Sequence, residues 1–220
     1  MPRILQGLLT PVITAALATL MLVLLDLAVG QPVPLAAAAL VGAIFGGAYG
    51  LQAGILLIYN LSTAWGWGQL IIDLTWSMPN TVFGFIFGNA IYIWFGWPTR
   101  SSSENSGWIV YTPRGSSGFG VDVLQTLGTL NLGGTGAHER VHLVQARIFG
   151  PLYLPVFGLN YVVNFFIQVL WTFTLGGLLW LVKLREKPFF RPLSGPVPGF
   201  FGWIYRATLF ELWAYGTESH

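Results

Sequence analysis

The sequence predicts an all-α integral membrane protein with about four to six membrane helices and a small extramembrane segment of loops and strands. Apolar residues make up 54% of the 220 positions and charged residues only 8%, whereas a soluble domain carries about 25% charged residues. The mean hydropathy is +0.66. A chain of this composition belongs in a lipid bilayer, and we expect it to cross that bilayer several times.

Membrane helices are expected where apolar residues run for nearly the length of a bilayer crossing, about 20 residues. Four stretches meet this condition, namely residues 4–29, 35–59, 81–97 and 156–182. The first is longer than the apolar region of a cleavable signal peptide, about 7–15 residues, so we expect a retained helix. A fifth stretch, residues 61–78, is interrupted by Asp73 and by glycine and polar residues. It is expected inside the bundle or at the membrane interface, with Asp73 at interfacial depth.

Glycine recurs every fourth residue in the second stretch, at Gly42, Gly46, Gly50 and Gly54. This spacing aligns all four on one face of a helix, and small residues let two membrane helices approach closely. The face would pack either on another helix of this chain or on a second subunit. We favour packing within the chain, because such patterns are common in membrane helices.

The composition divides the chain into residues 1–97, which hold the N-terminal membrane helices, and residues 98–220. The second part opens with a polar segment rich in serine and glycine, in which short strands are expected at residues 108–111 and 121–132. It continues with the helix that carries the motif HExxH, a further membrane helix and a final helix over residues 200–215.

Charge and cysteine content exclude several classes of protein. The formal net charge is only +2, and no basic run is dense enough for nucleic-acid binding. The basic cluster at residues 183–191 is assigned to the cytoplasm by the positive-inside rule. Because the chain has no cysteine, disulfides and thiolate metal sites are excluded. The expected partners are the lipid bilayer and either another membrane protein or a second copy of this chain.

The motif HExxH occurs at His138, Glu139 and His142. Histidines four residues apart lie on one face of a helix and can bind one metal ion. The glutamate between them suits a general base that removes a proton from the attacking water, whose pKa a bound zinc ion lowers. The motif therefore predicts a zinc site. The alternative is the end of an amphipathic helix in which these polar residues occur by chance. Arg147, on the same helix, is expected to contact the surface or lipid headgroups.

A catalytic zinc ion generally has three protein ligands and one open position. Glu211 is the preferred third ligand, because a carboxylate in an apolar segment needs a partner and a metal ion would provide one. Arg206, five residues earlier, is the competing partner. Gln145, three residues after His142, is expected either to hydrogen-bond a ligand or the substrate or to cap the following loop.

The motif and the later glutamate resemble the zincin metallopeptidases, in particular the gluzincin branch. A group of small bacterial membrane proteins is more similar still, with HExxHxxQ, then Gly-Pro-Leu, then a glutamate in an ExWA context. Three segments of this chain match that pattern: HERVHLVQ (138–145), GPLYLP (150–155) and ELWA (211–214). In addition, TLGTLNL (126–132) is similar to the strand that precedes the motif in that group.

This resemblance covers residues 121–216. It implies a zinc-dependent metallopeptidase-like activity and a location in the bacterial inner membrane. It also implies that His138, His142 and Glu211 bind the metal and that Glu139 is the base.

Two functions are therefore expected from the sequence. The first is a membrane-embedded zinc metallopeptidase-like hydrolase. The alternative is a non-enzymatic accessory or structural subunit of a larger membrane complex, with a structural or vestigial metal site. Abundant glycine (28 residues) and tryptophan (10 residues) favour the alternative, because helix faces of that composition suit close packing.

Overall fold

The computed structural model describes residues 1–114, 125–133, 136–174, 178, 181–182 and 200–218. The chain forms two compact units, Met1–Pro151 and Leu152–His220. The boundary between the two units follows Pro151. The composition divides the chain at a different place, before Pro98. The prediction of a mostly helical chain with a small sheet before the motif helix is confirmed. The basic cluster at residues 183–191 lies outside the described residues.

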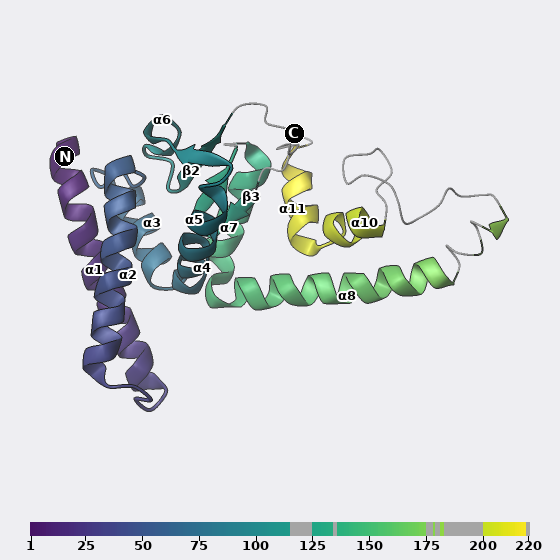
Figure 1. The fold of residues 1–220 in the computed structure, drawn as a ribbon, viewed down its shortest axis with the longest axis horizontal. Helices are drawn as coiled ribbons and strands as arrows, with labels where there is room; N and C mark the ends of the chain where they lie inside the picture. The colour runs from purple at the N-terminus through teal and green to yellow at the C-terminus, as the bar shows by residue number, and fades with distance from the viewer. Residues whose placement is uncertain (115–124, 134–135, 175–177, 179–180, 183–199, 219–220) are drawn as a thin grey trace. The chain divides into compact units, whose positions relative to one another are not determined.

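Unit 1 begins with a hairpin of two long helices, α1 (Arg3–Ala28) and α2 (Leu35–Leu56), which lie side by side (Figure 1). The four spaced glycines of α2 face α1 of the same chain. A Cβ atom on Gly46 would lie 2.3 Å from the carbonyl oxygen of Thr14. The Thr14 hydroxyl donates a hydrogen bond to the Gly46 carbonyl oxygen at 2.7 Å. Small residues thus allow the close helix contact that lipid alone would not drive.

The next helical segment is bent rather than straight. It comprises α3 (Ala64–Leu74), α4 (Met78–Phe83), the π-helical turn η1 (Gly84–Gly88) and α5 (Asn89–Tyr92). The axis turns by 80° between α3 and the part that starts at Met78.

The expected single helix over residues 81–97 is wrong in its last third, because helix α5 ends at Tyr92 and strand β1 begins at Gly96. Residues 96–98 pair with strand β2 (Ile109–Pro113) instead of continuing the helix, and Pro98 disfavours helical geometry at the residue before it, Trp97.

A small sheet covers this bent segment. Its strands β1 (Gly96–Pro98), β2 (Ile109–Pro113), β4 (Leu130–Leu132) and β3 (Gln125–Leu127) lie in that spatial order. The β2–β4 pair is parallel and the other pairs are antiparallel. The short helix α6 (Arg100–Ser103) lies between β1 and β2 in sequence. The main core forms where the sheet meets the helices, and its fully buried members include Tyr49, Leu70, Tyr92, Ile109 and Leu130.

The motif lies on α7 (Ala137–Phe149), which is followed by the short turn η2 (Gly150–Leu152). Unit 2 contains α8 (Tyr153–Phe173), α10 (Phe200–Arg206) and α11 (Leu209–Glu218). The expected single helix over residues 200–215 is wrong, because it breaks before Leu209. The Thr208 hydroxyl accepts a hydrogen bond from the Glu211 backbone N–H at 3.3 Å, as a residue that starts a new helix does.

Within the described residues, three helical segments are long and apolar enough to cross a membrane: Arg3–Ala28, Leu35–Leu56 and Ala137–Phe173. A fourth would be added if the bent pair of segments, Ala64–Leu74 and Met78–Tyr92, counts as one span. The outer faces of α1 and α2 agree with such a location, because large apolar side chains such as Ile4, Val12 and Ile44 are more than 60% exposed.

Candidate metal centre

The two motif histidines face each other on the first turns of α7. The Nε2 atoms of His138 and His142 lie 3.2 Å apart, and both side chains are buried. Two nitrogen ligands of one tetrahedral zinc ion, each about 2.0–2.1 Å from the ion, are separated by about 3.3 Å. At the observed distance the two nitrogens share either a proton or an ion. The pair therefore has the spacing that a chelating histidine pair requires.

Gln145 fixes the orientation of His142. The Nδ1 atom of His142 lies 2.9 Å from Oε1 of Gln145, whose side chain is fully buried. Because a carbonyl oxygen only accepts hydrogen bonds, the Nδ1 atom carries the proton and donates it. The neutral ring then has its lone pair on Nε2, the atom that faces His138. This contact is a hydrogen bond to a candidate metal ligand, which is one of the two roles expected for Gln145.

The sheet holds the carboxylate of Glu139. The Thr126 hydroxyl on β3 donates a hydrogen bond to Oε2 of Glu139 at 2.6 Å. The Asn131 amide on β4 donates to the Thr126 hydroxyl oxygen at 3.1 Å. Glu139 is 3% exposed, so this hydrogen bond compensates part of the cost of burying the carboxylate. Thr126 and Asn131 were not singled out from the sequence, although both lie in the strand segment that precedes the motif.

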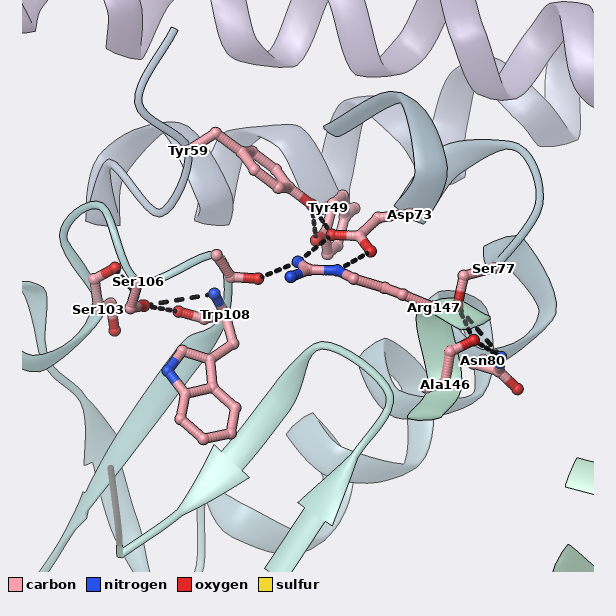
Figure 2. A network of polar contacts seen from close by, with 11 residues as sticks. Tyr49, Tyr59, Asp73, Ser77, Asn80, Ser103, Ser106, Trp108, Ala146 and Arg147 are labelled. Carbon is pink, nitrogen blue, oxygen red and sulfur yellow. Dashed lines mark hydrogen bonds and ion pairs between the residues drawn. The ribbon is translucent and has the colours of Figure 1, made fainter. Parts of the chain in front are cut away.

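The far end of α7 is held by one side chain from the α3–α4 turn, Ser77, and one from α4, Asn80 (Figure 2). Ser77 and Asn80 both donate to the carbonyl oxygen of Ala146, at 2.9 and 3.1 Å. Asn80 also donates to the Gly150 carbonyl oxygen at 2.7 Å. The last carbonyls of a helix have no partner within the helix. Side chains from a distant part of unit 1 therefore both satisfy these carbonyls and set the position of the motif helix.

A buried ion pair lies next to this contact. Arg147 donates to both carboxylate oxygens of Asp73, at 2.8 and 2.7 Å, and also to the Gly107 carbonyl oxygen. The Tyr59 hydroxyl donates to Asp73 at 2.8 Å, and the Tyr49 hydroxyl lies 2.6 Å from that of Tyr59 (Figure 2). The expectation that Arg147 contacts the surface or lipid headgroups is wrong, because its guanidinium is paired with the buried Asp73. A carboxylate with no exposed surface needs a charged partner, and the fold provides one from α7.

Glu211 belongs to unit 2, where it lies in the first turn of α11 and is 2% exposed. The nearby Tyr205 hydroxyl is hydrogen-bonded to the Glu211 side chain. Burial raises the pKa of Tyr205 well above its ordinary value, and the negative charge of Glu211 raises it further. The Arg206 guanidinium lies over the ring of Tyr215, 5.8 Å from its centre.

The buried residues that could donate to a metal ion are two imidazoles of unit 1, His138 and His142, and one carboxylate of unit 2, Glu211. Nitrogen and carboxylate oxygen donors in this number are the set that catalytic zinc sites use, but they also suit other divalent ions. Comparison of the chain with protein-family models, with curated proteins and with solved structures gave no match.

Proposed function

We propose that this protein is a membrane-embedded metallohydrolase of the zinc-peptidase type. The observation that carries the proposal is the 3.2 Å separation of the two Nε2 atoms of His138 and His142, with His142 oriented by Gln145. A pair arranged only for packing would not need its tautomer selected by a buried amide. The resemblance of the motif to zincins supports the same conclusion.

In this proposal His138 and His142 hold the ion through Nε2, and Glu211 is the third ligand. Zinc, when bound, lowers the pKa of water and polarises a carbonyl group. Glu139 accepts a proton from the attacking water and returns it to the leaving group. Thr126 holds the Glu139 carboxylate in the orientation that accepts this proton. The proposed substrate class is a peptide or another acyl compound, because the mechanism requires a carbonyl carbon.

The test is the metal content of the detergent-purified protein, measured by mass spectrometry for the natural chain, His142→Ala and Glu211→Ala. The proposal expects about one zinc ion per chain in the natural protein, as for a mononuclear site, and its loss in both variants. Loss in His142→Ala alone would remove Glu211 from the ligand set. A natural chain without metal would overturn the proposal and favour the accessory-subunit alternative.

A second measurement separates catalysis from a structural metal. Glu139→Gln is expected to keep the metal, because Glu139 is not a ligand in the proposal, and to lose hydrolysis of a peptide library. A structural site predicts that this variant and the natural chain behave alike. Arg140→Gln, at an exposed position next to Glu139 on the same helix, is the matched control.

A further inference from the structure

The exposed positive charges of α1 and α6 lie at one end of unit 1. Arg3 starts α1, and its guanidinium pairs with Glu104 at 2.8 Å, while Arg100 of α6 pairs with the same glutamate at 3.5 Å. Both arginine side chains remain well exposed, at 73% and 47%. A backbone hydrogen bond joins the residue after α2 to the loop after α6, since the Asn105 N–H donates to the Leu57 carbonyl oxygen at 2.9 Å. The start of α1, the end of α2 and α6 therefore meet.

The sheet and a group of exposed tryptophans lie at the same end. Trp65 is 73% exposed at the start of α3, and Trp97 on β1 is 58% exposed. Arg114, directly after β2, places its guanidinium 3.8 Å from the ring centre of Trp97. Trp94, just before β1, is 77% exposed. Exposed tryptophan next to arginine is the composition of a surface at the level of lipid headgroups.

The connection between α1 and α2 lies at the opposite end of the hairpin (Figure 1). It differs from the arginine-bearing end in its charge. No lysine or arginine occurs anywhere between Arg3 and Arg100, so the connection carries no positive charge. Its nearest charged residue is Asp26, which accepts a hydrogen bond from the Val33 N–H at 3.2 Å. The two ends of the hairpin therefore differ in positive charge. By the positive-inside rule, arginine and lysine in short segments near helix ends are retained on the cytoplasmic side.

The bent segment starts and finishes at the arginine-bearing end. Its helix α3 follows the residues that contact the N-terminus, since the terminal amine donates to the Ser62 hydroxyl at 2.6 Å. Its last helix, α5, leads directly into β1 of the sheet. The 80° bend lies between these two points. Two ends on the same side of the unit are the arrangement of a re-entrant loop, one of the two arrangements that fit such a bent pair of helices.

We propose that unit 1 is inserted with its sheet, α6 and the start of α1 in the cytoplasmic headgroup layer. The α1–α2 hairpin then crosses the membrane, and its connection at residues 29–34 faces the opposite side. The partner of the arginine and tryptophan end is the anionic phosphate layer of the cytoplasmic leaflet. Because β3 and β4 hold Glu139 next to the histidine pair, the substrate of the proposed hydrolase would arrive from the cytoplasm. That last consequence rests on the proposed function, whereas the orientation does not.

The chain suits a direct test, because it contains no cysteine and single-cysteine variants need no background substitutions. Gln31→Cys reports on the hairpin connection and Ser101→Cys on α6, and both positions are exposed. Each variant is expressed in a bacterial inner membrane and treated with a membrane-impermeant maleimide, before and after the cells are permeabilised. We expect Gln31→Cys to be labelled in intact cells, and Ser101→Cys to be labelled only after permeabilisation.

The reverse pattern, or both positions behaving alike, would overturn the proposal. Pro32→Cys and Thr112→Cys, also exposed, repeat the test at each end if a first variant does not accumulate. In a second arm, Ser101→Cys is combined with neutralisation of Arg3 and Arg100 to Gln. Part of the α6 position should then become labelled in intact cells, and an unchanged pattern would show that these charges do not set the orientation. Neither arm depends on bound metal, so the failure of this proposal is distinct from that of the hydrolase proposal.

Discussion

Arg147 on α7 donates hydrogen bonds to both carboxylate oxygens of Asp73 on α3, across 74 positions of sequence. The carboxylate is fully buried and the arginine side chain is 11% exposed. Through this pair the helix that carries the histidines is attached to the helical bundle five residues after His142. The position of the candidate metal centre therefore depends on a contact far outside the motif.

Arg147→Met should strongly destabilise unit 1, because it leaves the Asp73 carboxylate buried without its charged partner. Loss of one partner of a buried ion pair costs about 3–5 kcal/mol. The apparent unfolding temperature of the detergent-purified protein should fall clearly. The control is Arg140→Met, at an exposed position of the same helix. The double variant Asp73→Asn with Arg147→Met should recover part of the loss, and a natural unfolding temperature in Arg147→Met alone would contradict the assignment.

Gly50→Ala should disrupt the α1–α2 contact. A Cβ atom at this position would lie 1.8 Å from the Thr14 hydroxyl oxygen and 2.6 Å from the Pro11 Cα. The two helices must separate to accommodate it, at a cost of about 1–3 kcal/mol. The matched control is Gly47→Ala on the same helix, because nothing lies within 4 Å of its Cβ position. Thermal unfolding of the two variants should differ, and equal effects would show that the glycine face is not tightly packed.

Gln145→Ala should weaken metal binding without removing a ligand. The variant loses the acceptor that keeps the His142 proton on Nδ1, and loss of such a contact typically lowers metal affinity roughly tenfold to a hundredfold. Zinc affinity is measured by competition with a chelating dye. Val144→Ala, at a residue that is 45% exposed on the same helix, is the control. Unchanged affinity in Gln145→Ala would mean that the amide does not orient the ligand.

Thr126→Val should destabilise the protein, whereas Thr126→Ser should not. Valine keeps the shape but removes the hydroxyl that donates to Glu139 at 2.6 Å. A hydrogen bond to a charged group contributes about 1.5–3 kcal/mol, and the hydrogen bond from Asn131 to this hydroxyl would be lost as well. Serine retains the donor and serves as the control. Equal unfolding temperatures for the valine and serine variants would contradict a role for this hydroxyl.

Stability should fall at high pH partly because of Tyr59. Burial raises the pKa of Tyr59 well above its ordinary value of 10, and the charge of Asp73 raises it further. The folded protein keeps this proton, while the unfolded chain loses it above about pH 10. The contribution of Tyr59 to the free energy of unfolding is therefore complete below about pH 10. It declines as the pH rises further, by up to about 1.4 kcal/mol per pH unit.

The measurement is the unfolding temperature from about pH 9 to about pH 11, the range around the ordinary tyrosine pKa. Tyr59→Phe should start lower, because it loses the hydrogen bond to Asp73, but it should decline less steeply than the natural chain. Parallel curves for the two proteins would mean that Tyr59 ionises equally in the folded and unfolded states.

Local patterns in the sequence determined the long helices and the histidine pair. The first two apolar stretches became α1 and α2 to within a few residues, because hydrophobic length and backbone hydrogen bonding act within one segment. The spacing of four residues was sufficient to bring His138 and His142 together, since the helix repeat alone aligns them.

Only the tertiary structure decided what surrounds that pair. Thr126 reaches Glu139 because β3 pairs with β4 beside α7, and Asp73 meets Arg147 because the chain bends between α3 and α4. The pairing of β1 with β2 turned the end of the expected helix over residues 81–97 into a strand. These contacts join residues that are 13 and 74 positions apart, and no local periodicity encodes such pairs. They form because buried polar groups must find partners wherever the packed chain supplies them.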